Sequence, residues 1–258
     1  MLERITPVIL TLNEEANIGR VLARLSWART IVVVDSFSTD GTMEILSEFS
    51  NVKVFKRRFD SHAGQWNFAI GETGVQTPWV LALDADYVLT DGLVKELVAL
   101  NPDSRVAGYR AGFRYCIFGK PLRGTLYPPV TVLYRREGAR YIQDGHTQRI
   151  ELPGSVEQLA APILHDDRKP LSSWLWAQNR YMDLEAKVIK NKPWSALGKA
   201  DKVRRLVVVA PALTFFYCLF VKGGVLDGYA GLYYAMQRSL AEVILSLKLI
   251  QARVGRIE

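Results

Sequence analysis

Over its first hundred residues the chain alternates between short apolar runs and segments with helical spacing. Four short, mostly apolar runs predict strands of a sheet covered on both faces: Thr6–Leu12, Thr30–Val34, Val52–Phe55 and Trp79–Leu83. Apolar residues recur at helical spacing in four other segments: Asn17–Leu25, Thr42–Phe49, Gln65–Ile70 and Asp91–Leu100. This alternation predicts an α/β fold, with a mostly parallel sheet flanked by helices.

The pattern changes after about residue 105. Residues 105–165 are rich in Gly, Pro, Arg and Tyr, and predict an antiparallel extension with a second binding site. Its expected strands are Ala107–Tyr115, Thr131–Arg135 and Arg149–Leu152. From Leu171 onward the spacing is helical. We therefore expect a domain over residues 1–170, with halves 1–100 and 101–170, and a helical region over 171–258.

The most apolar stretch is Leu206–Val221, which is preceded by Arg204 and Arg205 and followed by Lys222. A membrane-spanning helix needs about 20 apolar residues, and Pro211 interrupts this shorter run. A helix or helical hairpin in the membrane interface is the better prediction, with the basic residues on anionic lipid. We expect a peripheral or monotopic protein on the cytoplasmic face of the inner membrane.

Composition narrows the class of protein. The 258 residues are 49% hydrophobic and 23% charged, which is a globular balance and excludes a disordered chain. Lys and Arg outnumber Asp and Glu by 33 to 26, so partners that carry phosphate are expected. The two cysteines are too far apart in sequence to indicate a zinc module or a disulfide framework, and favour a reducing compartment. Glu3 and a short apolar run argue against a signal peptide at the start.

Polar side chains follow three of the predicted strands at their carboxyl ends. Asn13 and Glu15 follow the first strand, Asp35 follows the second, and Asp84 and Asp86 follow the fourth. Ligands of parallel α/β sheets bind beyond the carboxyl ends of the strands. We therefore expect these side chains to converge on one ligand.

The sharpest of these signals is Asp84-Ala85-Asp86. Two carboxylates at i and i+2 face one side of an extended backbone, where they repel each other unless a cation lies between them. Oxygen ligands of this kind suit Mg²⁺ or Mn²⁺, with phosphate oxygens completing the shell. An isolated motif of this length is more often a pair of solvated loop acids, but the other acidic strand ends favour the metal.

The second signal is the run DSFSTDGT at residues 35–42. Asp35, directly after a strand, is predicted to accept hydrogen bonds from a ribose or a nucleobase N–H. Asp40 precedes Gly41 and the next helix, which has Glu44 in its first turn. We therefore predict that Asp40 caps that helix.

Four segments together resemble the inverting family 2 glycosyltransferases, which have the GT-A fold. They are ILTLNEEANI at 9–18, IVVVDSFSTDGT at 31–42, GQWNFAI at 64–70 and WVLALDADY at 79–87. HDDRK at 165–169 and KGGVLDGYAG at 222–231 are similar to the bacterial branch that includes lipopolysaccharide-core glucosyltransferases of the WaaE type. The resemblance implies a nucleotide-diphosphate sugar as donor and a lipid-linked or lipopolysaccharide acceptor.

The resemblance also implies roles for the matching residues. The nucleotide-sugar pocket would include Leu12, Asn13, Glu15, Asp35, Gln65, Asn67, Asp84 and Ala85. Asp86 would bind the Mn²⁺ or Mg²⁺ ion that bridges the diphosphate, and His165 would complete the metal site. On the residues alone, a lone histidine is more often structural than a ligand. With Asp166 and Asp167 beside it and an acidic metal pocket predicted elsewhere, the two roles of His165 are equally open.

An inverting transfer needs a general base that deprotonates the acceptor hydroxyl. The family places an acid between the paired aspartates and the late histidine, where this chain reads YIQDGHTQ at 141–148. Many relatives carry Glu directly after the histidine, whereas Thr147 follows His146 here. Asp144 is therefore the predicted base and His146 the second candidate, and an Asp-Gly turn is the alternative role for Asp144.

Other functions make different demands on the sequence. A nucleotidyltransferase acting on sugar phosphates should carry a Gly-rich basic phosphate loop after the first strand, where this chain has the acidic NEE. Acidic strand ends and the lack of a nucleic-acid-binding motif argue against a nucleic acid partner. A non-catalytic membrane-bound scaffold with a degenerate glycosyltransferase fold stays open, because the Glu after His146 is missing.

Overall fold

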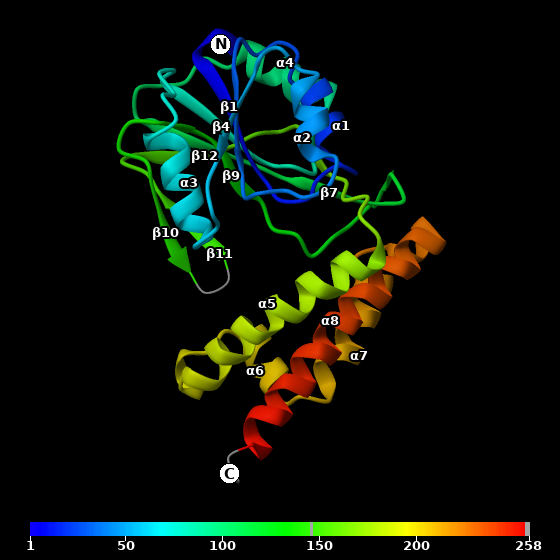
Figure 1. Cartoon of the computed structure of the whole chain (residues 1–258). Helices are drawn as coiled ribbons and strands as arrows, with labels where there is room; N and C mark the ends of the chain where they lie inside the picture. Colours follow the sequence, from blue (N-terminus) through cyan, green and yellow to red (C-terminus); the bar gives the residue numbers. More distant parts are fainter. Residues whose placement is uncertain (145–146, 256–258) are drawn as a thin grey trace. The chain divides into compact units, whose positions relative to one another are not determined.

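The chain forms two compact units (Figure 1). The computed structural model describes residues 1–144 and 147–255, with the backbone alone for Asp144 and Thr147. The first unit comprises Met1–Gly119 and Tyr127–Arg168. The second comprises Lys120–Leu126 and Lys169–Glu258.

The first unit is built on a sheet in the order β12-β6-β9-β4-β1-β2-β3. The strands are β1 (Ile5–Thr11), β2 (Ile31–Asp35), β3 (Val52–Lys56), β4 (Trp79–Asp84), β6 (Val106–Ala111), β9 (Val130–Arg135) and β12 (Ser155–Gln158). Among these described strands, β9 alone runs opposite to its two neighbours, β4 and β6. The predicted α/β fold with a mostly parallel sheet is confirmed.

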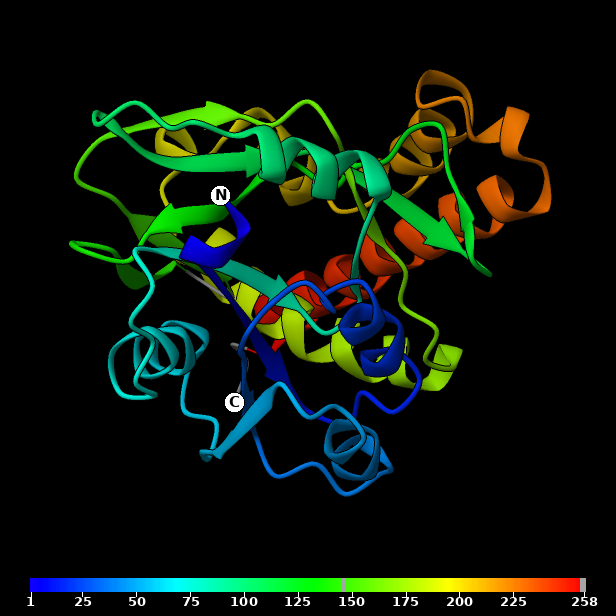
Figure 2. The ribbon, with the colours of Figure 1, turned by 90° about the horizontal axis from the view of Figure 1, so that it is seen from above.

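Helices cover both faces of this sheet. α3 (His62–Gly71) lies on one side of β1, and α1 (Ile18–Ala23) with α2 (Thr42–Ser47) lies on the other (Figure 2). α4 (Asp91–Ala99) packs into the same core as α1 and α2. In β1, β2 and β4, alternate residues enter alternate cores, and both cores are apolar. These three strands therefore show no polar alternation in the sequence.

The strand predicted over Ala107–Tyr115 is wrong, because the structure divides it. β6 ends at Ala111, and β7 (Phe113–Ile117) begins after Gly112 and joins a different sheet. In that sheet β13 (Ile163–His165) pairs in parallel with β7 and antiparallel with β5 (Tyr87–Leu89). β13 comes from a distant part of the chain, which the local pattern of 107–115 does not reveal.

The expected antiparallel extension is only partly correct. β9 is antiparallel to its neighbours, and β10 (Arg140–Asp144) forms a separate antiparallel pair with β11 (Thr147–Glu151). By contrast, β12 runs parallel to β6, and β13 runs parallel to β7. The second half of this unit therefore mixes both kinds of pairing.

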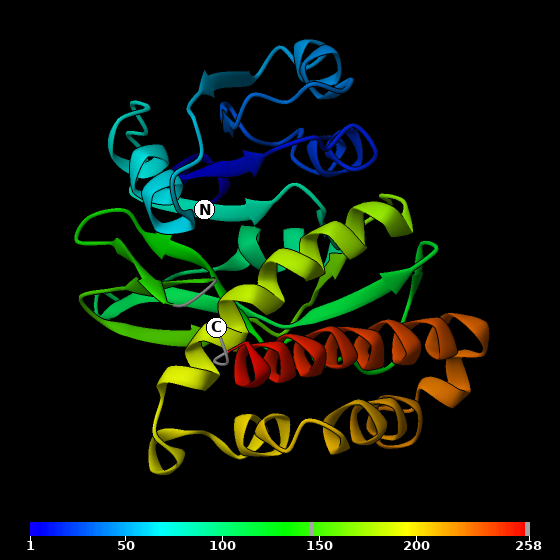
Figure 3. The same ribbon diagram turned by 60° about the horizontal axis from the view of Figure 1, so that its bottom comes forward.

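The second unit is helical beyond its first few residues. It contains α5 (Leu171–Asn191), α6 (Lys199–Arg205), α7 (Val209–Phe216) and α8 (Tyr229–Val254), with short turns η2 (Trp194–Ala196), η3 (Tyr217–Val221) and η4 (Gly224–Asp227). Figure 3 shows α8 lying beside both α5 and α7. The half-buried Arg204 on α6 donates to Glu242 on α8 at 2.8 Å and to Glu185 on α5 at 3.3 Å. This cation joins three helices.

Asp227 explains why the short segment Lys120–Leu126, which includes β8 (Lys120–Pro121), belongs with the helices. The backbone N–H of Arg123 donates to the buried Asp227 carboxylate at 2.9 Å, and Lys120 Nζ donates to its carbonyl oxygen at 3.0 Å. Gly228, in a positive-φ conformation, then turns the chain from η4 into α8, where Gly231 packs against η4.

The apolar stretch Leu206–Val221 is helical over most of its length, as α7 followed by η3. None of the helices in the described part of the chain is long and apolar enough to cross a membrane. Many of its apolar side chains and those just after it face solvent, including Val208 at 81%, Val221 at 69% and Tyr229 at 90% exposure.

Candidate active site

Asp86 and His165 lie side by side beyond the carboxyl end of β4. The register of β5 with β13 puts His165 opposite Tyr87, and the backbone N–H of Asp166 donates to the Asp86 carbonyl oxygen at 3.0 Å. As a result His165 Nε2 lies 3.0 Å from Asp86 Oδ2. The structure therefore brings together the two residues that the resemblance assigns to a metal.

An aromatic cage surrounds the His165 ring. Its members are Tyr87, Phe113, Tyr115 and Tyr127, with ring centroids 4.7 to 6.5 Å from that of the imidazole. Burial alone would lower the pKa of His165, but the charge and hydrogen bond of Asp86, together with the charges of Asp84 and Asp167, raise the pKa above its usual value. The cage and Asp86 together fix the direction in which Nε2 points.

The spacing of Asp86 and His165 fits a divalent cation. Two adjacent ligands of an octahedral ion at about 2.1 Å lie about 3 Å apart, and Nε2 and Oδ2 are 3.0 Å apart. Among the described residues no group of three or more His, Cys, Asp or Glu side chains could hold a metal. Mg²⁺ sites of this type are completed by substrate phosphates and water, so two protein ligands suit an ion that arrives with a diphosphate.

Asp35 is fully buried at the end of β2. Thr11 Oγ1 donates to Asp35 Oδ2 at 3.0 Å, and the backbone N–H of Ser38 donates to Oδ1 at 2.9 Å. The Ser38 hydroxyl also bonds Oδ2, at 2.5 Å. Both carboxylate oxygens therefore hold the loop that follows β2, and contact with a ribose or base stays a prediction.

Hydrogen bonds join the loop after β1 to the loop after β2. Asn13 Oδ1 accepts the backbone N–H of Thr39 at 2.8 Å, and Glu15 Oε2 accepts that of Gly41 at 2.8 Å. Asn13 and Phe37 both have positive φ, which is uncommon for residues other than glycine and is found often at functional sites. Two apolar side chains, Leu12 at 41% and Phe37 at 49% exposure, face solvent at this edge.

Asp40 binds the start of α2 but is not its N-cap residue, so the predicted cap is only partly correct. Its Oδ1 accepts the N–H of Thr42, the first residue of that helix, at 3.1 Å, although the N-cap position itself is Gly41. Its Oδ2 accepts the N–H of Glu15 at 3.1 Å. Partial burial alone would raise the pKa of Asp40, but hydrogen bonds from the Thr42 hydroxyl and from these backbone N–H groups lower it.

Gln65 and Asn67, predicted to contact nucleotide and sugar, both form hydrogen bonds within the protein. Buried Gln65 donates to Ser36 Oγ at 2.8 Å and accepts from Arg57 Nη1 at 2.5 Å, so it joins the ends of β2 and β3. Asn67 exchanges two hydrogen bonds with the backbone of Tyr141. Contact of either residue with a donor stays a prediction.

A polar network centred on Asn17 was not predicted from the sequence. Its Nδ2 donates to Glu14 Oε2 at 2.8 Å and to Asp167 Oδ1 at 2.9 Å, and its Oδ1 accepts the N–H of Arg168 at 2.9 Å. This side chain therefore joins the loop after β1 to the loop after β13. Its occurrence in the NEEAN run was the available signal, but the partner loop could not be identified from sequence.

Buried Asp166 strengthens the same junction. Its carboxylate pairs with Arg20 from α1 and with Arg168, the latter at 2.9 Å. The network holds the residue after His165 in place, and so supports the position of His165 beside Asp86.

The predicted base lies at the tip of the β10–β11 hairpin. β10 ends at Asp144, whose side chain is outside the described part of the structure, as is the whole of His146. Near the start of β10, the ring of Tyr141 stacks on the ring of Trp66 from α3, with 5.5 Å between the ring centroids. This contact anchors the hairpin to α3. The roles of Asp144 and His146 therefore stay predictions.

Comparison with known sequences places this site in a family. The sequence model described as "Glycosyl transferase family 2" matches residues 6–148, which include most of β1, all of β2 to β4, and β10 with Asp144. The chain belongs to glycosyl transferase family 2. It is therefore a glycosyltransferase, and the resemblance noted from its motifs is confirmed.

Relatives of family 2 extend the likeness beyond the matched segment. The chain is 27% identical over 94% of its length to the lipopolysaccharide core biosynthesis glycosyltransferase LpsC of Rhizobium meliloti, of which it covers 90%. An uncharacterized glycosyltransferase of Rickettsia bellii is 36% identical over 96 residues, 37% of this chain and 32% of that relative.

A solved structure shares the fold. Residues 1–349 of S. aureus TarS, determined in complex with UDP-GlcNAc, match with a TM-score of 0.50 and 17% identity, over 97% of this chain and 92% of that one. At this identity the likeness concerns the fold alone, and the GT-A-like architecture is confirmed.

Proposed function

We propose that this family 2 glycosyltransferase transfers a sugar from a nucleotide-diphosphate sugar to a lipopolysaccharide or lipid-linked acceptor at the membrane, with inversion at the anomeric carbon. The observation that carries the donor assignment is the 3.0 Å pairing of Asp86 with His165 at the carboxyl end of β4.

The chemistry follows from the residues at this edge of the sheet. Asp86 and His165 would hold a Mn²⁺ or Mg²⁺ ion, which supplies the counter-charge for the departing diphosphate. Asp84 and Ala85 would contact the ribose or the sugar, beside Leu12 and its neighbours. Asp144 would take the proton of the acceptor hydroxyl as its oxygen attacks the anomeric carbon. One base is sufficient, because inversion needs no covalent intermediate.

The acceptor is proposed from the full-length relative. LpsC, by its name, acts in lipopolysaccharide core biosynthesis, and the likeness to it covers 94% of this chain, both units included. A shared acceptor class is the simplest reason for a likeness that extends through the helical unit. The sugar and the position on the core are left open.

Membrane association is proposed from the second unit, on the cytoplasmic face of the inner membrane. That unit holds 16 Lys and Arg against 6 Asp and Glu, a net charge of +10, while the first unit holds 17 against 20, a net charge of −3. The exposed apolar side chains of α7, η3 and η4 lie in the same positive unit. Apolar exposure combined with positive charge is typical of proteins that bind anionic membranes.

A thermal-shift screen with nucleotide sugars, with and without Mn²⁺, tests the donor and metal. A donor that binds the folded form raises the unfolding temperature, and Mn²⁺ should increase that rise. Asp86→Asn should abolish the Mn²⁺-dependent part and reduce transfer to a lipopolysaccharide core fragment at least 100-fold. Asp103→Asn is the matched control, since exposed Asp103 precedes β6 at the opposite end of the strands. Full transfer by Asp86→Asn would refute the proposal.

A further inference from the structure

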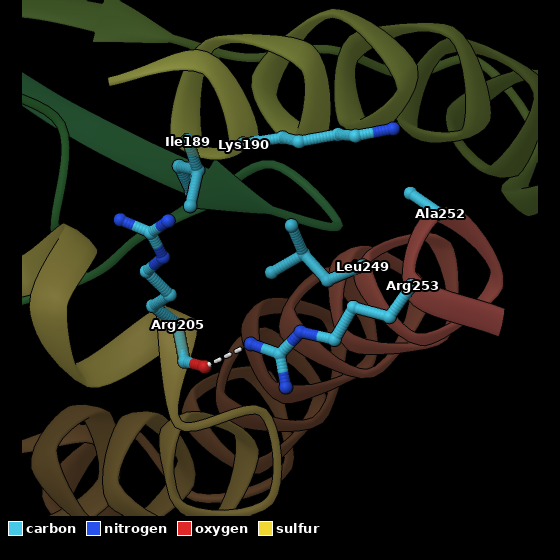
Figure 4. A pocket seen from close by; sticks show the side chains of 6 residues that line it. All are labelled: Ile189, Lys190, Arg205, Leu249, Ala252 and Arg253. Atoms are coloured by element: carbon cyan, nitrogen blue, oxygen red, sulfur yellow. Dashed lines mark hydrogen bonds between the residues drawn. The ribbon is translucent and has the colours of Figure 1, made fainter. Parts of the chain in front are cut away.

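The helical unit contains a pocket of about 220 Å³ between the end of α5, the end of α6 and the last turns of α8 (Figure 4). Six residues line it: Ile189, Lys190, Arg205, Leu249, Ala252 and Arg253. Three of them are cationic and none is acidic. The pocket holds on the order of seven groups the size of water, at about 30 Å³ each, which is room for a phosphate group and its first ester atoms.

The cationic side chains that line this pocket have unused hydrogen-bond donors. Arg253 Nη2 donates to the Arg205 carbonyl oxygen at 2.6 Å, and Arg205 Nη1 donates to the Lys192 carbonyl oxygen at 3.1 Å. A guanidinium has five N–H donors, and these bonds fix each group while leaving most donors unused. No carboxylate in the described part of the chain forms an ion pair with Lys190, Arg205 or Arg253. The pocket is therefore suited to an anion.

The same pocket has an apolar floor, and exposed apolar side chains follow Arg205 in the chain. Figure 4 shows Ile189 from α5 and Leu249 from α8 pointing into the space between the helices, and both side chains belong to the buried core of this unit. Directly after Arg205, Leu206 is 57% exposed and Val208 is 81% exposed. A free inorganic anion would not pack against these apolar surfaces. The hydrocarbon part of an amphiphile would pack against them.

We propose that this pocket binds the phosphate of an anionic lipid, held by Lys190, Arg205 and Arg253, with the hydrocarbon chains along Leu206 and Val208. The inference deepens the proposed membrane association, on which it rests, by adding one defined lipid site to a general attraction. It does not involve the donor site of the first unit.

A vesicle-binding experiment separates a defined site from general attraction. Binding of the full chain is measured on phosphatidylcholine vesicles with and without phosphatidic acid, for Arg253→Gln and for Lys187→Gln. Lys187 is exposed on α5 but does not line the pocket. Lys187→Gln therefore measures the effect of losing one positive charge, which should lower the affinity for vesicles about fivefold. Arg253→Gln should cost about 25-fold or more on phosphatidic acid vesicles. Equal losses for the two variants would overturn the proposal.

A second pair of variants tests the pocket without removing a cation. Ala252 lines the pocket on α8, and Ala252→Glu and Ala252→Gln introduce side chains of the same size that differ in charge. Ala252→Glu should lose the preference for phosphatidic acid, while Ala252→Gln keeps most of it. Circular dichroism and thermal unfolding check that both variants fold. Equal binding by the two variants would overturn the proposal.

Soluble ligands distinguish a lipid phosphate from free phosphate. Short-chain dihexanoyl phosphatidic acid should raise the unfolding temperature of the wild type, and Arg253→Gln should remove that rise. Inorganic phosphate at the same concentration should have no effect, and an equal rise with it would overturn the lipid assignment. If the soluble lipid binds but no vesicle does, the proposed membrane association fails while the pocket stands.

Discussion

The side-chain amide of Asn67 and the backbone of Tyr141 exchange two hydrogen bonds of 2.8 Å each. Asn67 Oδ1 accepts the Tyr141 N–H, and Asn67 Nδ2 donates to the Tyr141 carbonyl oxygen. A side chain of α3 thereby satisfies the backbone of β10 as a neighbouring strand would. Since β10 leads directly to Asp144, we regard Asn67 as a positioning residue for the predicted base.

Asn67→Ala should therefore slow transfer more than it weakens donor binding. Two hydrogen bonds of about 0.5–1.5 kcal/mol each hold the hairpin, so we expect kcat to fall roughly 5- to 150-fold. The KM for the nucleotide sugar should change little. The same change at exposed Asn101 is the control. A large rise in donor KM with unchanged kcat would instead support the predicted contact of Asn67 with the donor.

Asp144→Asn should stop transfer while preserving donor binding. The amide cannot accept the proton of the acceptor hydroxyl, and loss of a general base typically costs about 10²- to 10⁴-fold in rate. Binding of the nucleotide sugar, followed by thermal shift, should match the wild type. If Asp144→Asn turns over normally, His146→Gln is the next variant to measure.

Asp166→Asn should destabilise the first unit. Asp166 is 6% exposed, and its replacement leaves Arg20 and Arg168 without their shared carboxylate. Breaking a buried ion pair costs about 3–5 kcal/mol, and the partial exposure of both arginines lowers the expected loss to about 2 kcal/mol. Urea unfolding measures the change. Asp103→Asn, which removes an exposed pair with Arg105, should leave the midpoint nearly unchanged.

Val208→Asp should weaken binding to anionic vesicles about tenfold or more, because a charged group at the interface must stay hydrated. The substitution should be tolerated by the fold, since Val208 is 81% exposed. Val98→Asp is the matched control, because Val98 on α4 of the first unit is also exposed, at 54%. Equal binding by Val208→Asp and the wild type would argue against the proposed membrane surface.

The elements predicted best from sequence are those whose pattern is local. The first four strands were predicted to within one residue at each end, and for β1, β2 and β4 the reason is that burial on both faces leaves continuous apolar runs. The division at Gly112 was missed, since it depends on which distant strand each half pairs with. Tertiary pairing of this kind leaves no trace in the spacing of apolar residues.

The candidate active site was also predicted only in part from the sequence. The sequence indicated that polar residues gather at the strand ends, and the structure places Asp86 against His165. It could not indicate that the oxygens of Asp35 are occupied by Thr11 and Ser38, or that Asn67 faces Tyr141. Which partner satisfies a polar group is decided by contacts between segments far apart in the chain.

The packing of Gly231 against η4 sets a strict size limit at one point of the helical unit. A β-carbon there would lie 1.9 Å from the carbonyl oxygen of Gly224, well inside the contact distance of two atoms. Even a methyl group would push η4 outward, and Asp227, which holds Lys120–Leu126, lies within η4. The absence of a β-carbon at Gly231 therefore allows η4 to hold Lys120–Leu126, a segment that lies about a hundred residues earlier in the sequence.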